Sequence, residues 1–398
     1  MDIYLRQEKF HRITFKFYRV SKLKKSEQTI RNLLCYYQEL ACKKYASEGL
    51  MTATLGNFYD AKYRVGLTNF GSYSVMEYSL TAIDPLYIED KDYNLEKLEN
   101  LFKDLIEAKM GQGKAMVKLF NRAFEIYKSD LLDHDENLQA VAFNRAISTY
   151  FKGTERDFSS YGCLDELEKI TPDELYKYYQ KVKKEESIMI ASGNIDEKNN
   201  NPYYTLKPKK NYHFRKRNSV EKTVKVSADS TQCYLEIFYE TNTFADDELY
   251  YATMLLNYVF GGHSNSKLFR TVREKYGLCY SINSMYLGAT GIIVVSAIIN
   301  LVDLDKTLKA IEECEKELKA QDFEIEEARN YYISALANGL DYLETAVNNY
   351  LADNFFLDTP KSDKELECLR KVTKEDVYQA FLKLKQSFVF VYGGDKVE

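Results

Sequence analysis

"LDELEKITPDELYKYYQKVKKEESIMIASGNID", residues 164–196, describes a short helix, a second helix that starts after a threonine, and an apolar strand that ends at a glycine. Thr171 suits the N-cap of the second helix because a threonine hydroxyl accepts a hydrogen bond from a first-turn amide. The run "IMIASG" at 188–193 is short, apolar and bounded by polar residues, which is typical of a buried strand. The stretch therefore predicts a helix–helix–strand unit.

The same unit returns about 200 residues later as "KELECLRKVTKEDVYQAFLKLKQSFVFVYGGD", residues 364–395. When Thr171 is placed over Thr373, the apolar positions coincide, and after a gap of two residues "IMIASG" falls on "FVFVYG". The matched pairs are Leu167 with Leu369, Leu175 with Val377, Tyr176 with Tyr378, and Tyr179 with Phe381. Self-similarity at this spacing indicates a duplicated domain.

The remaining segments follow the same plan in each half. An alternating strand comes first, at 12–20 and at 231–240, and helices follow, at 26–45 and 245–259. The other expected strands lie at 61–67, 74–83, 277–286 and 291–299, and the long helices at 112–150 and 322–357. No regular βαβ alternation or G-x-G-x-x-G turn is present, so the sequence predicts an α+β fold rather than a doubly wound sheet.

The expected domains are residues 1–198 and 222–398, joined by a linker at 199–221. The linker sequence is polar and basic and contains Pro202 and Pro208, which is typical of an inter-domain connection. Its cations could contact RNA or lipid, but a short solvated linker is the interpretation that a charge run of this kind favours. These cations are Lys207, Lys209, Lys210, Arg215, Lys216 and Arg217.

Composition limits the class of protein. Of the 398 residues, 45% are apolar and 29% charged, and the net charge of −5 argues against nucleic acid or a membrane surface as the main partner. The N-terminal segment shows no secretory signal, and the apolar run at 291–299 is too short to span a bilayer. Seven cysteines without a C-x-x-C pair indicate reduced thiols and a cytoplasmic location.

Most motifs that carry chemistry are absent, including phosphate-binding loops, G-x-S-x-G and H-E-x-x-H. Asp130 and His134 share a helix face, so they could form a weak metal site, but a solvated acidic helix end is favoured. Cys279 has no histidine reserved for it and His263 no evident partner, so both are interpreted as structural. No catalytic residue and no metal ligand is assigned to this chain.

The stretch "GGHSNSKLFRTVREKYGLCYS", residues 261–281, contains the strongest candidate site. We expect a helix whose apolar stripe is formed by Leu268, Phe269, Val272 and Tyr276, ended by Gly277. Arg273 would then lie at the edge of the exposed side, and Tyr280 in the returning strand. A guanidinium can hold a peptide carbonyl or carboxylate, and a phenol can donate to an oxyanion.

This stretch resembles the second-half signature of the pitrilysin/insulinase-like zinc peptidases, a family that includes mitochondrial processing peptidase. The matching motifs are Gly261-Gly262, Ser266-Lys267-Leu268-Phe269, Arg273-Glu274-Lys275-Tyr276-Gly277-Leu278 and Tyr280-Ser281. The resemblance covers essentially the whole chain. It implies two duplicated α/β sandwich domains of the pitrilysin/processing-peptidase type, forming half of a clam shell.

The family carries its zinc motif, H-x-x-E-H, on the first helix, but here "TIRNLLCYYQELACKKYA" (29–46) contains no histidine. Residues 33–37 lie roughly where the motif should be. The resemblance therefore implies a chain that binds no zinc and is inactive alone. It is similar to the zinc-motif-lacking subunits of paired bacterial peptidases, which would supply the substrate-binding residues Arg273 and Tyr280 to an H-x-x-E-H partner.

The expected assembly is thus a heterodimeric zinc metalloendopeptidase that cleaves short or unfolded peptides, with zinc held only by the partner. No nucleic-acid partner and no membrane insertion is expected. The alternative is a catalytically silent scaffold or assembly subunit, in which the retained residues only pack the domain. A neighbouring gene that encodes an H-x-x-E-H homologue would favour the peptidase over the scaffold.

Overall fold

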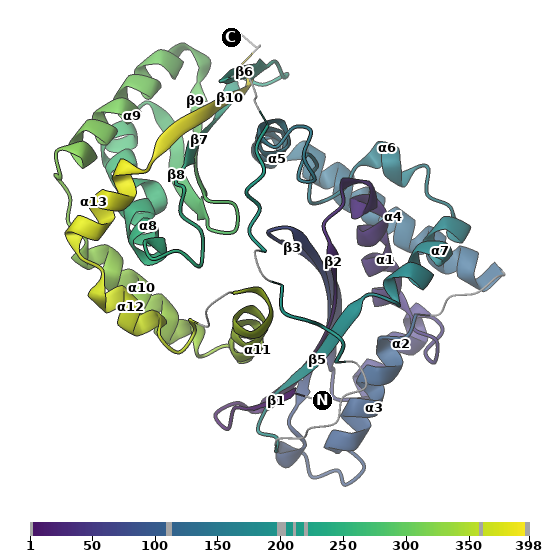
Figure 1. The fold of residues 1–398 in the computed structure, drawn as a ribbon. Helices are drawn as coiled ribbons and strands as arrows, with labels where there is room; N and C mark the ends of the chain where they lie inside the picture. The colour runs from purple at the N-terminus through teal and green to yellow at the C-terminus, as the bar shows by residue number, and fades with distance from the viewer. Residues whose placement is uncertain are drawn as a thin grey trace. The chain divides into compact units, whose positions relative to one another are not determined.

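The computed structural model describes residues 3–108, 114–196, 204–209, 212–218, 222–357 and 361–394. These residues form two compact units (Figure 1). Unit 1 contains residues 1–133, 160–210 and 339–356, and unit 2 contains 134–159, 211–338 and 357–398. Each unit therefore takes one segment from the opposite half of the sequence. The division of the sequence at 198 and 222 stays a prediction.

Unit 1 is built on a five-stranded sheet of order β1-β5-β2-β4-β3. The first pair, β1 with β5, is parallel and the other pairs are antiparallel. Its strands are β1 Ile3–Arg6, β2 Arg12–Lys22, β3 Lys62–Phe70, β4 Tyr73–Ile83 and β5 Glu186–Gly193. The middle strand β2 is buried along almost its whole length, because both faces of the sheet are covered.

Helices cover the two faces of this sheet unequally (Figure 1). Phe15 and Phe17 pack into a large apolar core with the helices of one face. On the other face Lys16 reaches Asn348 of α11, with Nζ and Oδ1 3.5 Å apart. The helices of unit 1 are α1 Gln28–Leu40, α2 Glu48–Asn57, α3 Leu95–Leu105, most of α4 Lys114–Glu136, α6 Leu164–Leu167, α7 Pro172–Val182 and α11 Leu343–Leu351.

Unit 2 repeats this plan with the sheet order β6-β10-β7-β9-β8. Here β6 with β10 is the parallel pair and the other pairs are antiparallel. Its strands are β6 Thr223–Val226, β7 Gln232–Glu240, β8 Cys279–Leu287, β9 Ile292–Asn300 and β10 Lys385–Gly393. The identical order of the two sheets confirms the duplication and the α+β class.

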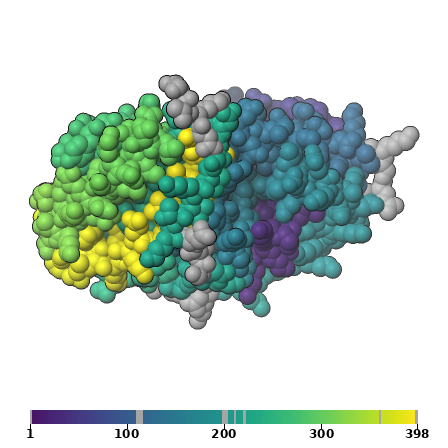
Figure 2. Space-filling view, turned by 90° about the horizontal axis from the view of Figure 1, so that it is seen from above, coloured from purple at the N-terminus to yellow at the C-terminus, as the bar shows by residue number. Residues whose placement is uncertain are grey.

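The helices of unit 2 also lie on both faces of the sheet. Leu235 and Ile237 of β7 belong to the core on one face, while Phe238 packs with α5 on the other. The helices are α5 Leu138–Tyr150, α8 Tyr250–Asn257, α9 Leu304–Lys319, α10 Glu326–Gly339, α12 Glu365–Lys371 and α13 Lys374–Leu382. In Figure 2 the C-terminal segment (yellow) lies beside the α9–α10 segment (green), and α13 packs against α9.

The repeated helix–helix–strand unit is present in both halves as expected. Thr171 and Thr373 each cap the following helix, and each forms a capping box with the residue three positions later, Glu174 or Asp376. Leu175 and Val377, matched in the sequence, are both fully buried. The two halves therefore share the same helix-capping hydrogen bonds and the same buried core positions.

The long helices differ from the expectation. The helix expected at 112–150 breaks at Asn137, whose side chain caps α5 through the amide of Ala140. The segment expected as one helix at 322–357 contains α10, α11 and a π-helical turn at Ala352–Phe356. The helix expected at 245–259 begins only at Tyr250 and continues as a π-helical turn, η3 Tyr258–Gly262. Apolar periodicity alone therefore predicts single long helices, whereas in the structure polar caps and π-helical turns divide them.

Candidate functional site

Residues 261–281 lie in unit 2 and connect α8 to the edge strand β8. The double glycine is required by packing: a Cβ on Gly261 would lie 2.7 Å from both Leu268 Cδ1 and Ser284 Oγ. A Cβ on Gly262 would lie 2.8 Å from Asn257 Nδ2. The two glycines therefore let the chain pass close to α8 and β8 before the next helical segment begins.

That segment is a π-helix, η4 Phe269–Lys275, where the sequence predicts an ordinary α-helix. The amide of Tyr276 donates to the carbonyl of Thr271 over 3.1 Å, an i→i−5 bond. π-helical turns are rare in proteins, and those that do occur are often found at functional sites. Leu268 and Val272 are fully buried as expected, but Tyr276 is 45% exposed, so it does not belong to the apolar stripe. Its hydroxyl instead donates to Glu313 over 2.8 Å.

Arg273 lies on the exposed side of η4. Its guanidinium stacks over the ring of Phe269, with Cζ 4.7 Å from the ring centroid. It forms no ion pair within the part of the chain that the structure describes. Glu326, a carboxylate on α10 that could have served as a counter-ion, pairs with Arg329 instead. The charged end of Arg273 is therefore held in place by an aromatic ring and available to a ligand.

Tyr280 lies at the start of β8, immediately after the turn at Gly277, whose φ of +63° favours glycine. The pairing of β8 with β9 shifts register between Cys279 and Ser281, so Tyr280 lies in a β-bulge. Bulges re-aim side chains and are frequent beside active sites. Tyr280 is 58% exposed, and its hydroxyl has no hydrogen-bond partner among the described residues.

The structure thus brings Arg273 and Tyr280 to the surface of the same unit, each with a free polar end, although no hydrogen bond joins them among the described residues. Cys279, between them, is half-buried, and burial raises the pKa of its thiol to about 11 although Arg273 opposes the shift. At neutral pH this thiol is protonated. Cys279 is therefore a structural residue, as the sequence indicates, and a poor nucleophile.

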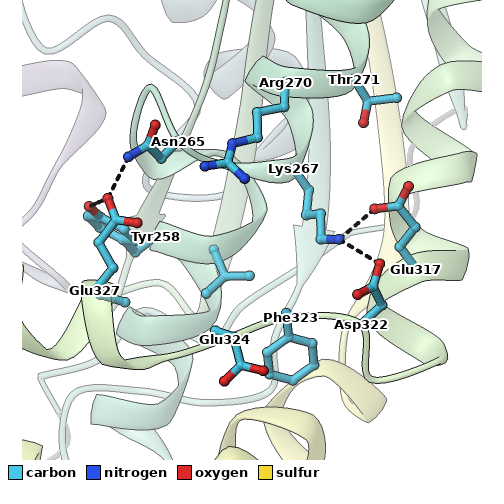
Figure 3. Close-up of a pocket in the computed structure, with 12 residues that line it drawn as sticks. Tyr258, Asn265, Lys267, Arg270, Thr271, Glu317, Asp322, Phe323, Glu324 and Glu327 are labelled. Carbon is cyan, nitrogen blue, oxygen red and sulfur yellow. Dashed lines mark hydrogen bonds and ion pairs between the residues drawn. The ribbon is translucent and has the colours of Figure 1, made fainter.

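A cavity of about 320 Å³ lies beside the π-helix, and its polar groups largely satisfy one another (Figure 3). Lys267 bridges Glu317 and Asp322, with N–O distances of 2.7 and 3.0 Å. On the opposite wall, Asn265 and Tyr258 both donate to Glu327, over 2.7 and 3.2 Å. No nucleophile and base are paired here, so the cavity supports the fold of the stretch without carrying chemistry of its own.

His263 belongs to this supporting network. Its ring stacks on that of Tyr258, with centroids 4.8 Å apart and an interplanar angle of 13°. Its Nδ1 accepts a hydrogen bond from the amide of Asn265 over 3.3 Å. These contacts agree with the structural role expected for His263.

The segment where the family carries its zinc motif is a core helix in this chain. On α1, Leu33, Leu34 and Tyr37 are fully buried. Burial raises the pKa of the Cys35 thiol to about 12, and the Tyr36 hydroxyl donates to Asp130 over 2.6 Å. Two leucines, a protonated thiol and two tyrosines do not fit a zinc ion, which needs thiolate, imidazole or carboxylate ligands. Among all described residues, no group of three or more metal-ligating side chains comes together.

The other sites considered from the sequence are not assembled. His134 Nε2 hydrogen-bonds Asn144 over 2.9 Å, while Asp130 accepts from Tyr36, so the two do not converge on a metal. No helix within the described ranges is both long enough and apolar enough to cross a membrane.

The segment expected to be a solvated linker is only partly exposed where it is described: Lys207, Arg215 and Lys216 are exposed, but other residues are packed. Tyr212, His213 and Phe214 are buried, and His213 Nε2 lies 2.7 Å from Asp246 Oδ2. Arg217 donates to three backbone carbonyls, and Lys209 pairs with Glu186. The expectation of a solvated segment was wrong at these residues, because their aromatic rings and cations find partners within the units. Lys210 and residues 199–203, 211 and 219–221 lie outside the described residues.

Lys16 and Glu236 are among the buried ionisable residues that were missed from the sequence. Lys16 and Glu236 occupy equivalent positions of the central strands, since Lys16 pairs with Ile190 and Glu236 with Phe390. Lys16 has a counter-ion, Glu77, at 2.9 Å. Glu236 receives a hydrogen bond from Ser296, and burial raises the pKa of its carboxyl to about 8. In both cases the available signal was a charged residue between two apolar neighbours in a strand sequence.

Comparison with known proteins shows what this chain is similar to. Residues 169–332 match the family model described as the Peptidase M16 inactive domain. The chain is 24% identical to the "probable inactive metalloprotease YmfF" of Bacillus subtilis, over 98% of this chain and 95% of that one. The resemblance expected from the sequence, to pitrilysin-type peptidases and to their members without a zinc site, is therefore confirmed.

Solved structures show the same fold. A conserved protein from Enterococcus faecalis superposes with a TM-score of 0.88 at 19% identity, covering 99% of this chain and 96% of that chain. The peptidase M16 inactive domain from Pseudomonas fluorescens superposes with a TM-score of 0.75 at 15% identity, covering 99% and 95%. Both likenesses span the two duplicated domains, so they confirm the fold across the whole chain.

Proposed function

Since the chain is a homologue of inactive M16-type metalloproteases, we propose that it is the non-zinc-binding subunit of a heterodimeric peptidase. Its partner is a homologous chain that carries H-x-x-E-H and the zinc ion. The substrate is a short or unfolded peptide. In this proposal Arg273 and Tyr280 contribute to the site at which the partner cleaves the peptide.

The observation that carries the proposal is the state of these two side chains. Both are exposed, neither polar end is engaged by the described residues, and each is oriented by a special backbone feature: a π-helix for Arg273 and a β-bulge for Tyr280. Residues retained only for packing would be buried or paired, as Tyr276 is with Glu313. Two free, positioned groups are what binding of a peptide main chain requires.

The chemistry assigned to this chain is binding and polarisation. The Arg273 guanidinium donates charge-assisted hydrogen bonds to a carbonyl or carboxylate of the peptide. The Tyr280 hydroxyl donates to the oxygen on which negative charge develops as the peptide bond is attacked. The zinc ion that activates water in such peptidases would belong to the partner, since α1 of this chain offers no ligand set.

The location expected from the sequence, the cytoplasm, is part of the proposal. All seven cysteines are free, which supports a reducing compartment. The scaffold reading remains the second candidate. The packed cavity around Lys267 and Glu327 favours it, because it shows that part of the family signature serves the fold itself.

Reconstitution tests the proposal. The chain and an H-x-x-E-H homologue from the same host are purified separately, mixed, and resolved by size-exclusion chromatography, and cleavage of a short unstructured peptide is then measured. We expect a 1:1 complex that cleaves the peptide much faster than either chain alone. A partner that is equally active without this chain, or the absence of a complex at micromolar concentration, would support the scaffold reading instead.

A further inference from the structure

Unit 1 contains a second cavity, of about 420 Å³, at the C-terminal end of α7. Its lining includes Arg19 of β2, Lys183 and Lys184 after α7, and Ser187 and Thr205. A volume of this size falls within the range of small-molecule sites, roughly 300–1,000 Å³. The lining carries three cations, Arg19, Lys183 and Lys184, and three carboxylates, Glu107, Glu185 and Glu186. The partners of these groups indicate what kind of molecule the cavity suits.

Arg19 is a buried cation without an acidic partner. The residue is 8% exposed, and Nη1 donates to the carbonyls of Val182 and Lys183 over 3.3 and 3.1 Å. Its Nε is buried without a hydrogen-bond partner, and no carboxylate within the described residues forms an ion pair with it. The carbonyls at the end of α7 supply only about half a negative charge. A buried charge that is not fully compensated is unfavourable unless an anion joins it.

Among the described residues, two more cations lack a carboxylate partner, although the ammonium of Lys183 lies 5.7 Å from the centroid of the Tyr179 ring. Lys183 and Lys184 are exposed and form no ion pair in the described part of the chain. The carboxylates that also line the cavity are committed elsewhere: Glu185 to Arg31, Glu186 to Lys209, and Glu107 to Lys43. Counting these pairs as neutral leaves the three charges of Arg19, Lys183 and Lys184. The cavity is therefore a region of net positive charge.

We propose that this cavity binds a small molecule that carries a phosphate group. A guanidinium matches the geometry of phosphate oxygens, and lysines add point charges around it. A phosphate bears up to two charges, which suits three cations better than a single carboxylate does. The hydroxyls of Ser187 and Thr205 give the wall polar groups. This site does not include Arg273 or Tyr280, so its test is independent of the test of the peptidase proposal.

Calorimetric titration of the full chain with inorganic pyrophosphate at low ionic strength tests the site. We expect saturable 1:1 binding. The double variant Lys183→Gln/Lys184→Gln should raise Kd about ten-fold or more, since each lost charge-assisted contact contributes on the order of a decade. The matched control Lys169→Gln/Lys177→Gln changes the net charge equally on exposed residues outside the cavity, and should leave Kd unchanged.

Absence of saturable binding, or an equal loss in the two double variants, would overturn the proposal. Citrate serves as the carboxylate probe, and binding of citrate as tight as that of pyrophosphate would overturn the assignment to phosphate. Arg19→Lys keeps the charge but removes the guanidinium fork, so it should also weaken binding. If that buried substitution prevents folding, the exposed lysine pair still decides the question.

Discussion

The guanidinium of Arg31 and the carboxylate of Glu185 form a two-pronged ion pair inside unit 1, with Nη1–Oε1 and Nη2–Oε2 distances of 2.7 Å each. The two side chains are 1% and 7% exposed. Arg31 lies on α1, the helix on which the resemblance to zinc peptidases would place the zinc motif. In this chain that helix is fixed to the segment before β5 by a buried ion pair, so its role is structural.

Removal of one partner of this pair should strongly destabilise the chain. Glu185→Gln leaves the buried Arg31 without its counter-ion, and breaking a buried pair in this way typically lowers the free energy of unfolding by ~3–5 kcal/mol. Urea unfolding measures the change. The double variant Arg31→Met/Glu185→Met should recover part of the loss, because neither charge then remains buried. If Glu185→Gln were as stable as the wild type, the ion pair would make no contribution to the free energy of unfolding.

Glu236 should make stability depend on pH. Burial raises the pKa of its carboxyl from 4.5 to about 8, so the folded chain keeps the proton that the unfolded chain releases. Its contribution is fully present below pH 4.5 and is lost as pH rises towards 8. Glu236→Gln, which cannot ionise, should therefore become more stable relative to the wild type between pH 5 and pH 8. The urea midpoints at the two pH values measure this.

The matched control for this prediction is Glu89→Gln, on an exposed loop. The difference in stability between Glu89→Gln and the wild type should be the same at pH 5 and at pH 8. If Glu236→Gln and the wild type kept a constant difference from pH 5 to pH 8, the carboxyl would not be held protonated in the folded chain.

The chain purified alone should hold no stoichiometric zinc. The residues of α1 at the expected motif are apolar, aromatic or a protonated thiol, and they offer no set of ligands. Elemental analysis after dialysis is the measurement. About one tightly held zinc ion per chain would contradict this account of α1.

The fold was largely predictable because its signals are local. The alternation in β2 and β7, the apolar runs of β5 and β10, and the capping threonines Thr171 and Thr373 are all visible in the sequence. The strands β1 and β6 were missed. Each has four residues and pairs in parallel along a neighbour through backbone hydrogen bonds, which leave no periodic pattern of side chains.

The site was predictable in its residues but not in its geometry. A 3.6-residue periodicity over 268–276 cannot distinguish an α-helix from the π-helix that exposes Tyr276. The bulge at Tyr280 depends on the pairing of β8 with β9, a contact distant in the sequence. The lone cation Arg19 was likewise invisible, because its isolation from carboxylates is a property of the packed chain.

Arg273→Ala should weaken substrate binding in the reconstituted peptidase. The loss of one charge-assisted hydrogen bond contributes ~1.5–3 kcal/mol, or about a ten- to hundred-fold fall in kcat/KM. Most of the change should appear in KM. Lys275→Ala is the control, since Lys275 lies on the same π-helix but pairs with Glu313. An equal fall in both variants would assign the effect to the helix instead of to Arg273.

The proposal that this chain completes the partner's site is tested most directly by Tyr280→Phe in the reconstituted complex. The hydroxyl has no partner within the described structure and the residue is 58% exposed, so its removal should leave folding and assembly unchanged. Tyr276→Phe, which removes a hydroxyl bound to Glu313, is the matched control and should retain full activity. With the complex confirmed by size-exclusion chromatography, we predict that Tyr280→Phe lowers kcat by ~10²–10³, the usual effect of losing an oxyanion donor. An intact complex with an unchanged kcat would contradict the account and leave the scaffold role in its place.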